Sequence, residues 1–165
     1  SAAIGQSDNA FTPIQLAAYC MTIANNGVRY KTHLVQSVIG YDGSETMVEP
    51  EVAATVSWSQ EAIDTVRQGM RQGMTDGTAS RYFKNVTAYT AAGKTGTAQT
   101  GIDGRSDHGV FIGYAPYDNP EVAIAVVLEN GTSRPSTRLA KTMLDAYFAS
   151  KDAGVAPTPE GELLP

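Results

Sequence analysis

A single lysine stands among small residues in residues 88–101, AYTAAGKTGTAQTG. Lys94 would supply a fixed positive charge that binds a carboxylate and lowers the pKa of nearby groups. Thr95 and Thr97 would offer hydroxyl groups to the same carboxylate. Gly96 has no side chain, so a substrate backbone could lie close against the strand, and the amide of Thr97 could point at a developing oxyanion. These residue types in this order favour an acyl-transfer site.

Two other interpretations of the lysine stretch stay open. Gly93-Lys94-Thr95 matches the end of a phosphate-binding loop, but the first glycine of that motif would fall at position 88, which is Ala88. The motif also leads toward a predicted strand, whereas a phosphate-binding loop leads into a helix. The other interpretation is a small-residue strand with an incidental lysine, since three residues recur by chance.

The remaining reactive side chains predict no further site. His33 and His108 have no cysteine or histidine at ligand spacing, so no metal site is expected. The one cysteine, Cys20, falls on the apolar face of a predicted helix and is expected to be a core residue. Ser106-Asp107-His108 is expected to be a loop and not a catalytic triad, because neighbours on an extended segment point to opposite faces. His108 could still line the mouth of a cleft.

Length and charge limit the class of protein. The chain has 165 residues, 42% of them hydrophobic, which is typical of one domain with a real core. A net charge of −5 argues against a nucleic-acid partner, because phosphate binding needs a basic surface. No run approaches the ~18 apolar residues of a membrane span, and the start, SAAIGQSDNA, has neither the basic nor the apolar part of a leader. If the protein works outside the cytoplasm, its targeting segment would therefore lie outside this chain. No cofactor is expected.

Three segments carry helical patterns around the lysine stretch. Thr12 with Gln15 predicts a capping box, and Gly27 predicts the end of this first helix, whose apolar face would hold Leu16, Cys20, Ile23 and Ala24. A second helix would begin with a capping box of Ser57 and Gln60, end at Gly77, and bury Ile63, Val66, Met70 and Met74. The third would span residues 133–150, with Pro135 near its start and an apolar stripe of Leu139, Ala140, Met143, Leu144 and Tyr147.

The strand patterns predict an antiparallel arrangement. Two β-rich runs in residues 33–51 flank Asp42-Gly43, which predicts a hairpin. Residues 87–99, 108–116 and 121–130 are predicted as consecutive strands with short connections, and such connections imply an antiparallel sheet. Residues 76–85 are expected to form a loop, and residues 1–6 a short strand. Residues 151–165 carry prolines and acids with little to bury, so we expect a disordered tail after a domain of residues 1–150.

The motifs in their longer context resemble the class B penicillin-binding proteins, the D,D-transpeptidases of peptidoglycan synthesis. Lys-Thr-Gly is one of the motifs of that family and its relatives. The blocks IGQSDNAFTPIQLA, GMTDGTA, AAGKTGTAQ and HGVFIGYAPYDNPEVAIAVVLENG occur in the family's order over roughly residues 1–150. The resemblance implies an α+β fold, a mainly antiparallel sheet with helices on both sides. It implies that Lys94, Thr95, Gly96 and Thr97 bind the D-Ala-D-Ala stem peptide and β-lactams, while a serine forms the acyl-enzyme.

The chain departs from the family pattern at the nucleophile. The family's serine sits in Ser-x-x-Lys, and no serine here is followed by lysine three residues later. Ser7-Asp8-Asn9 spells the family's second motif, but it follows the IGQ block instead of preceding it, so we interpret it as a helix entry. The resemblance thus implies the C-terminal portion of a transpeptidase domain with no catalytic residue in this chain. The missing N-terminal half would be its partner, in a membrane-anchored parent on the extracytoplasmic face that could join a cell-wall synthesis complex.

Two alternatives keep the fold but change the function. The absent Ser-x-x-Lys would suit a non-catalytic, transpeptidase-like binding module, although a purely structural strand has no need of the charge of Lys94. A serine β-lactamase or a β-lactam sensor shares the fold and the Lys-Thr-Gly motif. The TPIQLA and GYAP blocks favour the class B penicillin-binding proteins over these two.

Overall fold

A three-stranded antiparallel sheet forms the centre of the molecule in the computed structural model, which describes residues 9–153. Its strands are β5 (Ala92–Ala98), β6 (His108–Ala115) and β7 (Val122–Leu128), in the spatial order β5-β6-β7. Consecutive strands are neighbours, as the short connections predicted. The sheet therefore presents β5, the strand with the Lys-Thr-Gly motif, as one of its two outer strands.

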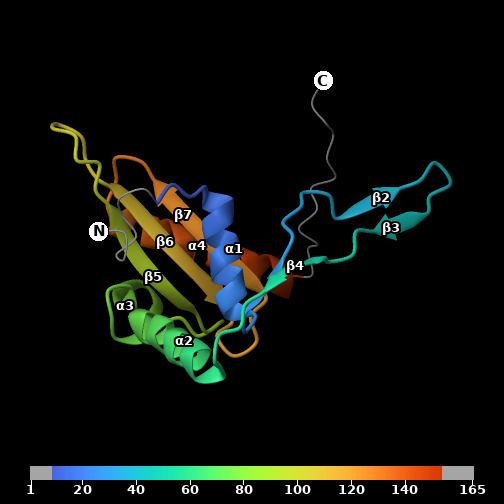
Figure 1. Ribbon diagram of the computed structural model, residues 1–165, viewed down its shortest axis with the longest axis horizontal. Coiled ribbons are helices and arrows are strands. Elements are labelled where there is room, and N and C mark those ends of the chain that lie inside the picture. Colours follow the sequence, from blue (N-terminus) through green and yellow to red (C-terminus); the bar gives the residue numbers. More distant parts are fainter. Residues whose placement is uncertain (1–8, 154–165) are drawn as a thin grey trace.

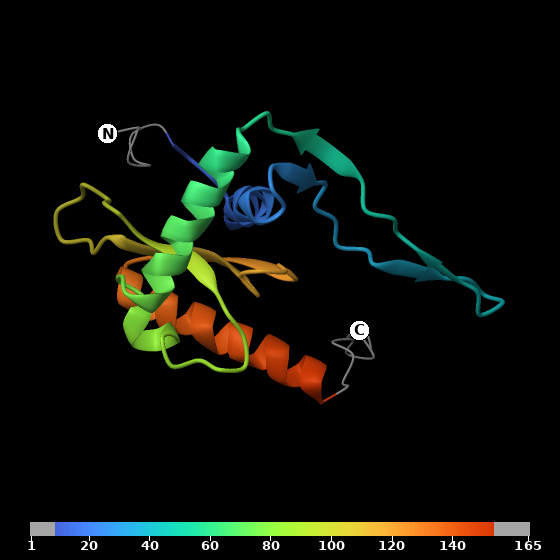
Figure 2. The same cartoon turned by 90° about the horizontal axis from the view of Figure 1, so that it is seen from below.

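Helices cover both faces of this sheet (Figures 1 and 2). In Figure 2 the sheet is seen edge-on, with α1 (Pro13–Ala24) on one side and α4 (Ser133–Asp152) on the other. The third long helix, α2 (Gln60–Thr75), crosses beside β5 and is followed by the short helix α3 (Ser80–Phe83). This arrangement confirms the predicted α+β fold with a mainly antiparallel sheet and helices on both sides.

Two small antiparallel pairs lie between α1 and α2 in the sequence. β1 (Val28–Tyr30) pairs with β4 (Val52–Thr55), and β2 (Ser37–Ile39) pairs with β3 (Glu45–Met47). The β2–β3 pair is the predicted hairpin, and it projects away from the body of the molecule (Figure 1). Gly43 has φ of +80°, a conformation that glycine adopts without strain, and it lies in the turn between the two strands.

The core consists of two clusters, one on each face of the sheet. The side chains of Phe111 and Ala115 face α3 and α4, together with Phe83, Leu144 and Phe148. The alternate residue, Tyr114, faces α1 and α2 instead, and its neighbours there are Cys20, Ile23, Ala24, Met70 and Ala92. This alternation along β6 is the two-residue period of a strand that is buried on both faces.

The helix boundaries agree with the sequence at α1 and differ at α2. The Thr12 hydroxyl accepts from the amide of Gln15 at 3.4 Å, and the Gln15 side chain accepts from the Thr12 amide at 2.8 Å, which confirms the capping box. The N-cap of α2 is Ser59 and not Ser57. Ser59 lies three residues before Ala62, and its hydroxyl accepts a hydrogen bond from the Ala62 amide at 3.2 Å. It thereby pairs one of the backbone amides that have no partner within the first turn of the helix.

Other differences concern what the helices bury. Val66, Leu139 and Met143 were expected in apolar stripes, but their side chains are exposed. The buried side of α4 instead includes Ser136 and Thr137, whose hydroxyls donate to the carbonyl of Ser133. Because these hydroxyls keep a hydrogen bond when they are buried, polar residues can lie on the buried side of the helix. A prediction from hydrophobicity alone therefore chose the wrong face.

The segment after α2 and the end of α4 also differ from the expected elements. Residues 76–85, expected as a loop, contain the short helix α3. Helix α4 includes Lys151 and Asp152, so it extends two residues into the expected tail; residues 154–165 lie outside the described part of the chain, as does the strand expected at residues 1–6. Within residues 9–153, no helix combines the length and the apolar character needed to cross a membrane.

Candidate active site

The Lys-Thr-Gly motif lies on the outer strand β5, where its side chains are accessible. Lys94 and Thr97 are exposed, and Thr95 and Gly96 are partly exposed. On the inner side the segment is fixed by pairing with β6, since Lys94 is opposite Ile112. The Lys94 ammonium donates to the carbonyl of Thr95 at 2.7 Å. A strand that is paired on one side and accessible on the other is a rigid support for groups that bind a ligand.

Among residues 9–153, no carboxylate forms an ion pair with the Lys94 ammonium. The ion pairs among residues 9–153 are Lys31–Glu51, Lys141–Asp145 and Lys151–Glu121, and none of them includes Lys94. Because no acidic side chain neutralises it there, the ammonium can attract an anion such as a carboxylate. On a strand, Thr95 and Thr97 lie on one face and Lys94 on the other, so an anion bound by all three would lie along the strand edge.

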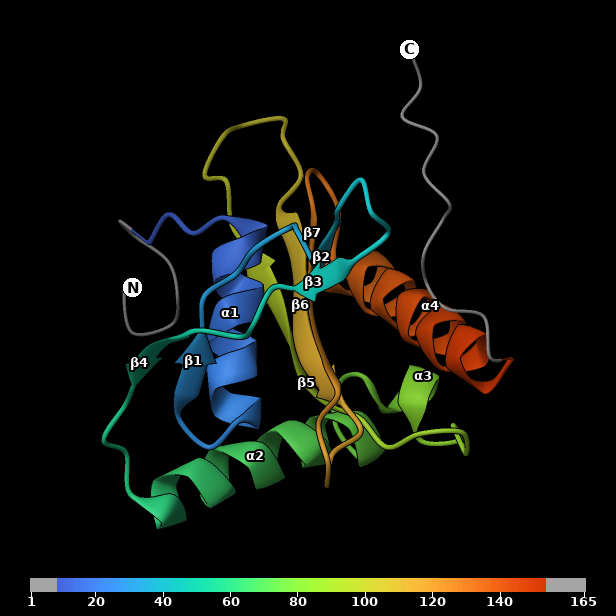
Figure 3. The same ribbon diagram turned by 90° about the vertical axis from the view of Figure 1, so that its right-hand side faces the viewer.

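Helix α2 fixes the start of β5 by direct contact. Figure 3 shows α2 crossing near the beginning of this strand. A Cβ atom built on Gly73 would lie 2.9 Å from the carbonyl oxygen of Gly93, so the absence of a side chain allows helix and strand backbones to touch. The Arg71 guanidinium donates to the carbonyl of Ala91 at 2.8 Å. The two contacts lie within the three residues before Lys94 and set the position of the motif relative to α2.

A second contact joins the motif to the turn after α2. The hydroxyls of Thr78 and Thr95 lie 2.9 Å apart, within hydrogen-bond distance. The turn itself is held by the Ala79 amide, which donates to the carbonyl of Gly73 at 3.1 Å, and by burial of Ala79. Thr78 belongs to the GMTDGTA block, but nothing in that block indicates a partner at Thr95, so the sequence predicted no role for this residue.

An arginine of α2, Arg67, joins three segments of the chain. Arg67 donates to the carbonyl of Ala24 at 3.3 Å, to the side chain of Asn26 at 2.7 Å and to the carbonyl of Tyr117 at 2.9 Å. Its guanidinium also lies 5.7 Å from the ring centroids of Tyr114 and Tyr117, a cation–π distance. Arg67 therefore joins α1, α2 and the β6–β7 connection, and its role in the described residues is structural.

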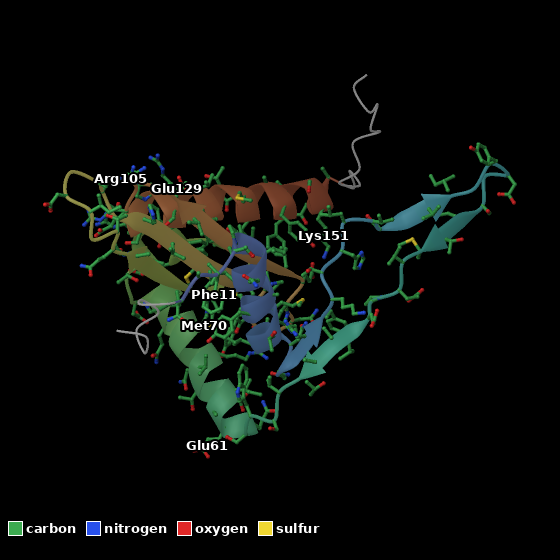
Figure 4. The ribbon with its side chains drawn as sticks, turned by 45° about the horizontal axis from the view of Figure 1, so that its top comes forward. Phe11, Glu61, Met70, Arg105, Glu129 and Lys151 are labelled. Atoms are coloured by element: carbon green, nitrogen blue, oxygen red, sulfur yellow. The ribbon has the colours of Figure 1, made fainter. Side chains whose placement is uncertain are left out.

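The other reactive side chains do not form a site. The Asn130 amide donates to Nδ1 of His108 at 3.1 Å, so the ring supports the chain reversal after β7. The β5–β6 connection projects beyond the sheet, with Arg105 on it (Figure 4). Cys20 is fully buried, and burial raises the pKa of its thiol to about 12, which keeps it unreactive at neutral pH. Ser7 and Asp8 lie outside the described residues.

Two surface depressions lie away from the lysine. One is lined by α1 and the start of β7, including Met21 and Val122, and the other lies between α1 and α2, including Tyr19 and Trp58. Neither is lined by Lys94, and within residues 9–153 no group of three histidine, cysteine, aspartate or glutamate side chains could hold a metal ion. Neither depression includes the Lys-Thr-Gly segment, which is accessible on the outer strand β5.

Comparison with curated proteins finds relatives that are much longer than this chain. The chain is 36% identical over 169 residues to Penicillin-binding protein 2A of Bacillus subtilis (strain 168), covering 90% of this chain and 23% of that protein. It is 31% identical over 165 residues to the Peptidoglycan D,D-transpeptidase MrdA of Acinetobacter baumannii, covering 92% of this chain and 24% of that protein. The chain therefore spans about a quarter of the length of these relatives.

Solved structures and family models agree with these relatives. Penicillin-binding protein A of Mycobacterium tuberculosis, in its imipenem acyl-enzyme complex, superposes with a TM-score of 0.75 at 29% identity, over 87% of this chain and 32% of that one. The model of the penicillin binding protein transpeptidase domain matches residues 1–147. The chain belongs to the penicillin binding protein transpeptidase domain family.

Proposed function

We propose that this chain is the C-terminal part of a penicillin-binding D,D-transpeptidase that cross-links peptidoglycan stem peptides through a serine acyl-enzyme. The observation that carries the proposal is the Lys94–Thr97 segment, which is accessible on an outer strand and has an ammonium without a carboxylate partner among the described residues. Family membership supports the assignment, as does the acyl-enzyme formed by a structural relative.

The segment would bind the free carboxylate at the end of D-Ala-D-Ala, and the equivalent carboxylate of a β-lactam. Lys94 supplies the charge, and the hydroxyls of Thr95 and Thr97 donate hydrogen bonds to the carboxylate oxygens. The peptide backbone lies beside Gly96, where no side chain blocks it. The Thr97 amide points at the carbonyl oxygen that gains negative charge when the serine attacks, and this stabilises the transition state.

The nucleophile would come from the part of the domain that precedes this chain. The serine oxygen forms a bond to the penultimate D-Ala carbonyl carbon, and the terminal D-alanine leaves with its amine protonated. An amine of a second stem peptide then attacks the resulting ester, which forms the new peptide bond and returns the proton to the serine. No serine of this chain has a lysine three residues later, so we expect this chain alone to form no acyl-enzyme.

The proposed parent works outside the cytoplasmic membrane. Stem peptides are cross-linked there, so we propose that an N-terminal segment anchors the parent on the extracytoplasmic face of the membrane. The other cell-wall synthesis proteins would be its partners in a complex. Fractionation of cells that express the parent with a C-terminal tag should place it in the membrane fraction, with the tag accessible to protease from outside the cytoplasm.

Two mass measurements test the catalytic proposal. This chain alone, incubated with benzylpenicillin, should keep its unmodified intact mass. A fusion of the upstream part of Bacillus subtilis Penicillin-binding protein 2A to this chain should gain one penicilloyl group on a serine of the upstream part. Lys94→Gln in this fusion should slow acylation by about tenfold or more, since it removes a charge-assisted contact, whereas Lys84→Gln at another exposed lysine should not.

Several outcomes of these measurements would contradict the proposal. A serine-linked adduct on this chain alone would place the nucleophile in it, with Ser7 as the first suspect. A fusion that folds but is not acylated would favour the non-catalytic binding module. Rapid release of penicilloic acid by the fusion would favour a β-lactamase. The coding sequence upstream of this chain gives a separate check, because the transpeptidase proposal requires Ser-x-x-Lys there.

A further inference from the structure

We propose that Thr78 is a positioning residue for the carboxylate site on β5. Its hydroxyl donates a hydrogen bond to the hydroxyl oxygen of Thr95, and the Thr95 proton is thereby directed at the carboxylate of the substrate. This inference rests on the proposed function, in which Thr95 binds that carboxylate. The structural observation behind it is the 2.9 Å distance between the two hydroxyl oxygens.

The direction of this hydrogen bond follows from the chemistry of the ligand. A hydroxyl has one proton to donate, and an ionised carboxylate can only accept. When Thr95 donates its proton to the carboxylate, it can meet Thr78 only as an acceptor, so Thr78 must be the donor. A hydroxyl that accepts one hydrogen bond becomes a better donor in the next, so the chain from Thr78 through Thr95 to the carboxylate strengthens the last contact.

The backbone around Thr78 holds its hydroxyl in place. The preceding Gly77 amide donates to the carbonyl of Gln72 at 2.9 Å, and the following Ala79 amide donates to the carbonyl of Gly73 at 3.1 Å. Ala79 is also buried, with 1% of its surface exposed. Gly73 in turn touches the backbone of β5 at Gly93. Thr78 is thus fixed between two anchored neighbours, on a turn that is bonded to the helix residue in contact with β5.

The exposure of Thr78 allows a positioning role to be distinguished from a contribution to stability. Thr78 is exposed, so water can replace its hydrogen bond when Thr95 no longer provides one. We therefore expect Thr78→Val to leave the unfolding transition nearly unchanged. The effect should be confined to ligands that carry the carboxylate, because only they require the Thr95 proton to point in one direction.

An NMR titration of this chain tests the proposal without any acyl-enzyme. Amide signals of residues 94–97 are followed while N-acetyl-D-Ala-D-Ala is added to tens of millimolar, and the same titration is made with its C-terminal amide. In the unmodified chain the acid should shift these signals with a measurable Kd. Thr78→Val should raise this Kd about fivefold, the effect of one net hydrogen bond, while the response to the amide stays the same. Thr78→Ser should restore the original Kd.

The outcomes distinguish this inference from the proposed function. If the acid shifts none of the signals of residues 94–97 in the unmodified chain, the carboxylate site is refuted, and the role of Thr78 with it. If the unmodified chain binds the acid and Thr78→Val binds it equally well, only the role of Thr78 is refuted. Equal weakening for the acid and the amide would show a structural effect and would also refute it. Thr46→Val, on the projecting hairpin, is the matched control and should change neither titration.

Discussion

The contact between Gly73 and Gly93 predicts opposite effects for the same substitution at two positions of α2. Gly69 and Gly73 are four residues apart on this helix. A Cβ atom on Gly69 would meet no atom within 4 Å, whereas one on Gly73 would lie 2.9 Å from the Gly93 carbonyl oxygen. We expect Gly69→Ala to stabilise the chain and Gly73→Ala to destabilise it, because only the second forces the helix away from β5.

The magnitudes follow from helix propensity and crowding. Alanine is more favourable than glycine inside a helix by about 1 kcal/mol, and at Gly69 nothing opposes this gain. At Gly73 the gain is smaller because the residue lies in the last turn, and the contact adds a crowding penalty of about 1–3 kcal/mol. The Gly93 carbonyl oxygen belongs to the backbone of a paired strand, so it cannot rotate away from the new methyl group. The free energies of unfolding of the two variants should therefore differ by about 2 kcal/mol.

Urea unfolding followed by far-UV circular dichroism measures this difference, and amide NMR spectra locate its origin. Gly73→Ala should move the signals of residues 92–97, while Gly69→Ala should leave them in place. If both variants gain stability by the same amount and the β5 signals stay unmoved, the helix does not press on the strand. The inference that α2 sets the position of the Lys-Thr-Gly motif would then be wrong.

Three further predictions use the same unfolding assay. Arg67→Met removes donors to three segments and should cost about 2–4 kcal/mol, whereas Arg81→Met at an exposed position should change stability by less than about 0.5 kcal/mol; equal effects would contradict the structural role of Arg67. Burial raises the pKa of the Cys20 thiol from 9.0 to about 12, so the folded chain holds this proton more tightly than the unfolded chain. The free energy of unfolding should accordingly fall as the pH rises from 9 to 12, by up to about 1.4 kcal/mol per pH unit. Cys20→Ala should make this fall shallower, and an unchanged slope would show that the thiol does not cause it. Tyr89→Phe removes the 2.7 Å hydrogen bond to Asp145 and should cost about 1 kcal/mol, and no loss would show that water replaces this bond.

Local sequence patterns predicted the elements that are defined by their own residues. The capping box of Thr12 and Gln15 joins residues that are three apart in the sequence, so it could be predicted without knowledge of the fold. The short connections between the three predicted strands likewise predicted the antiparallel sheet. The Lys94–Thr97 segment was found by residue type and order, although its exposure on an outer strand required the structure.

The features that sequence reasoning missed depend on partners distant in the chain. Leu139 and Met143 are apolar and helically spaced, but α4 meets the sheet with a face that includes Ser136 and Thr137. Which face is buried depends on the sheet and not on the helix. Thr78 meets the motif across 17 residues, and nothing in the intervening sequence indicates that contact. Short helices such as α3 are missed for another reason, since a single turn has no period to detect.

The order of elements along the chain also has a consequence for biogenesis. Helix α4 follows all three strands of the sheet, and it supplies Ala140, Leu144 and Phe148 to the cluster that buries Phe111. A polypeptide that emerges from its N-terminus, from a ribosome or through a translocation channel, can pair β5, β6 and β7 before α4 exists. During that interval one apolar face of a freshly paired sheet is open to solvent. The interval between the synthesis of Leu128 and that of Phe148 is therefore one in which nascent molecules expose this face to chaperones and to one another.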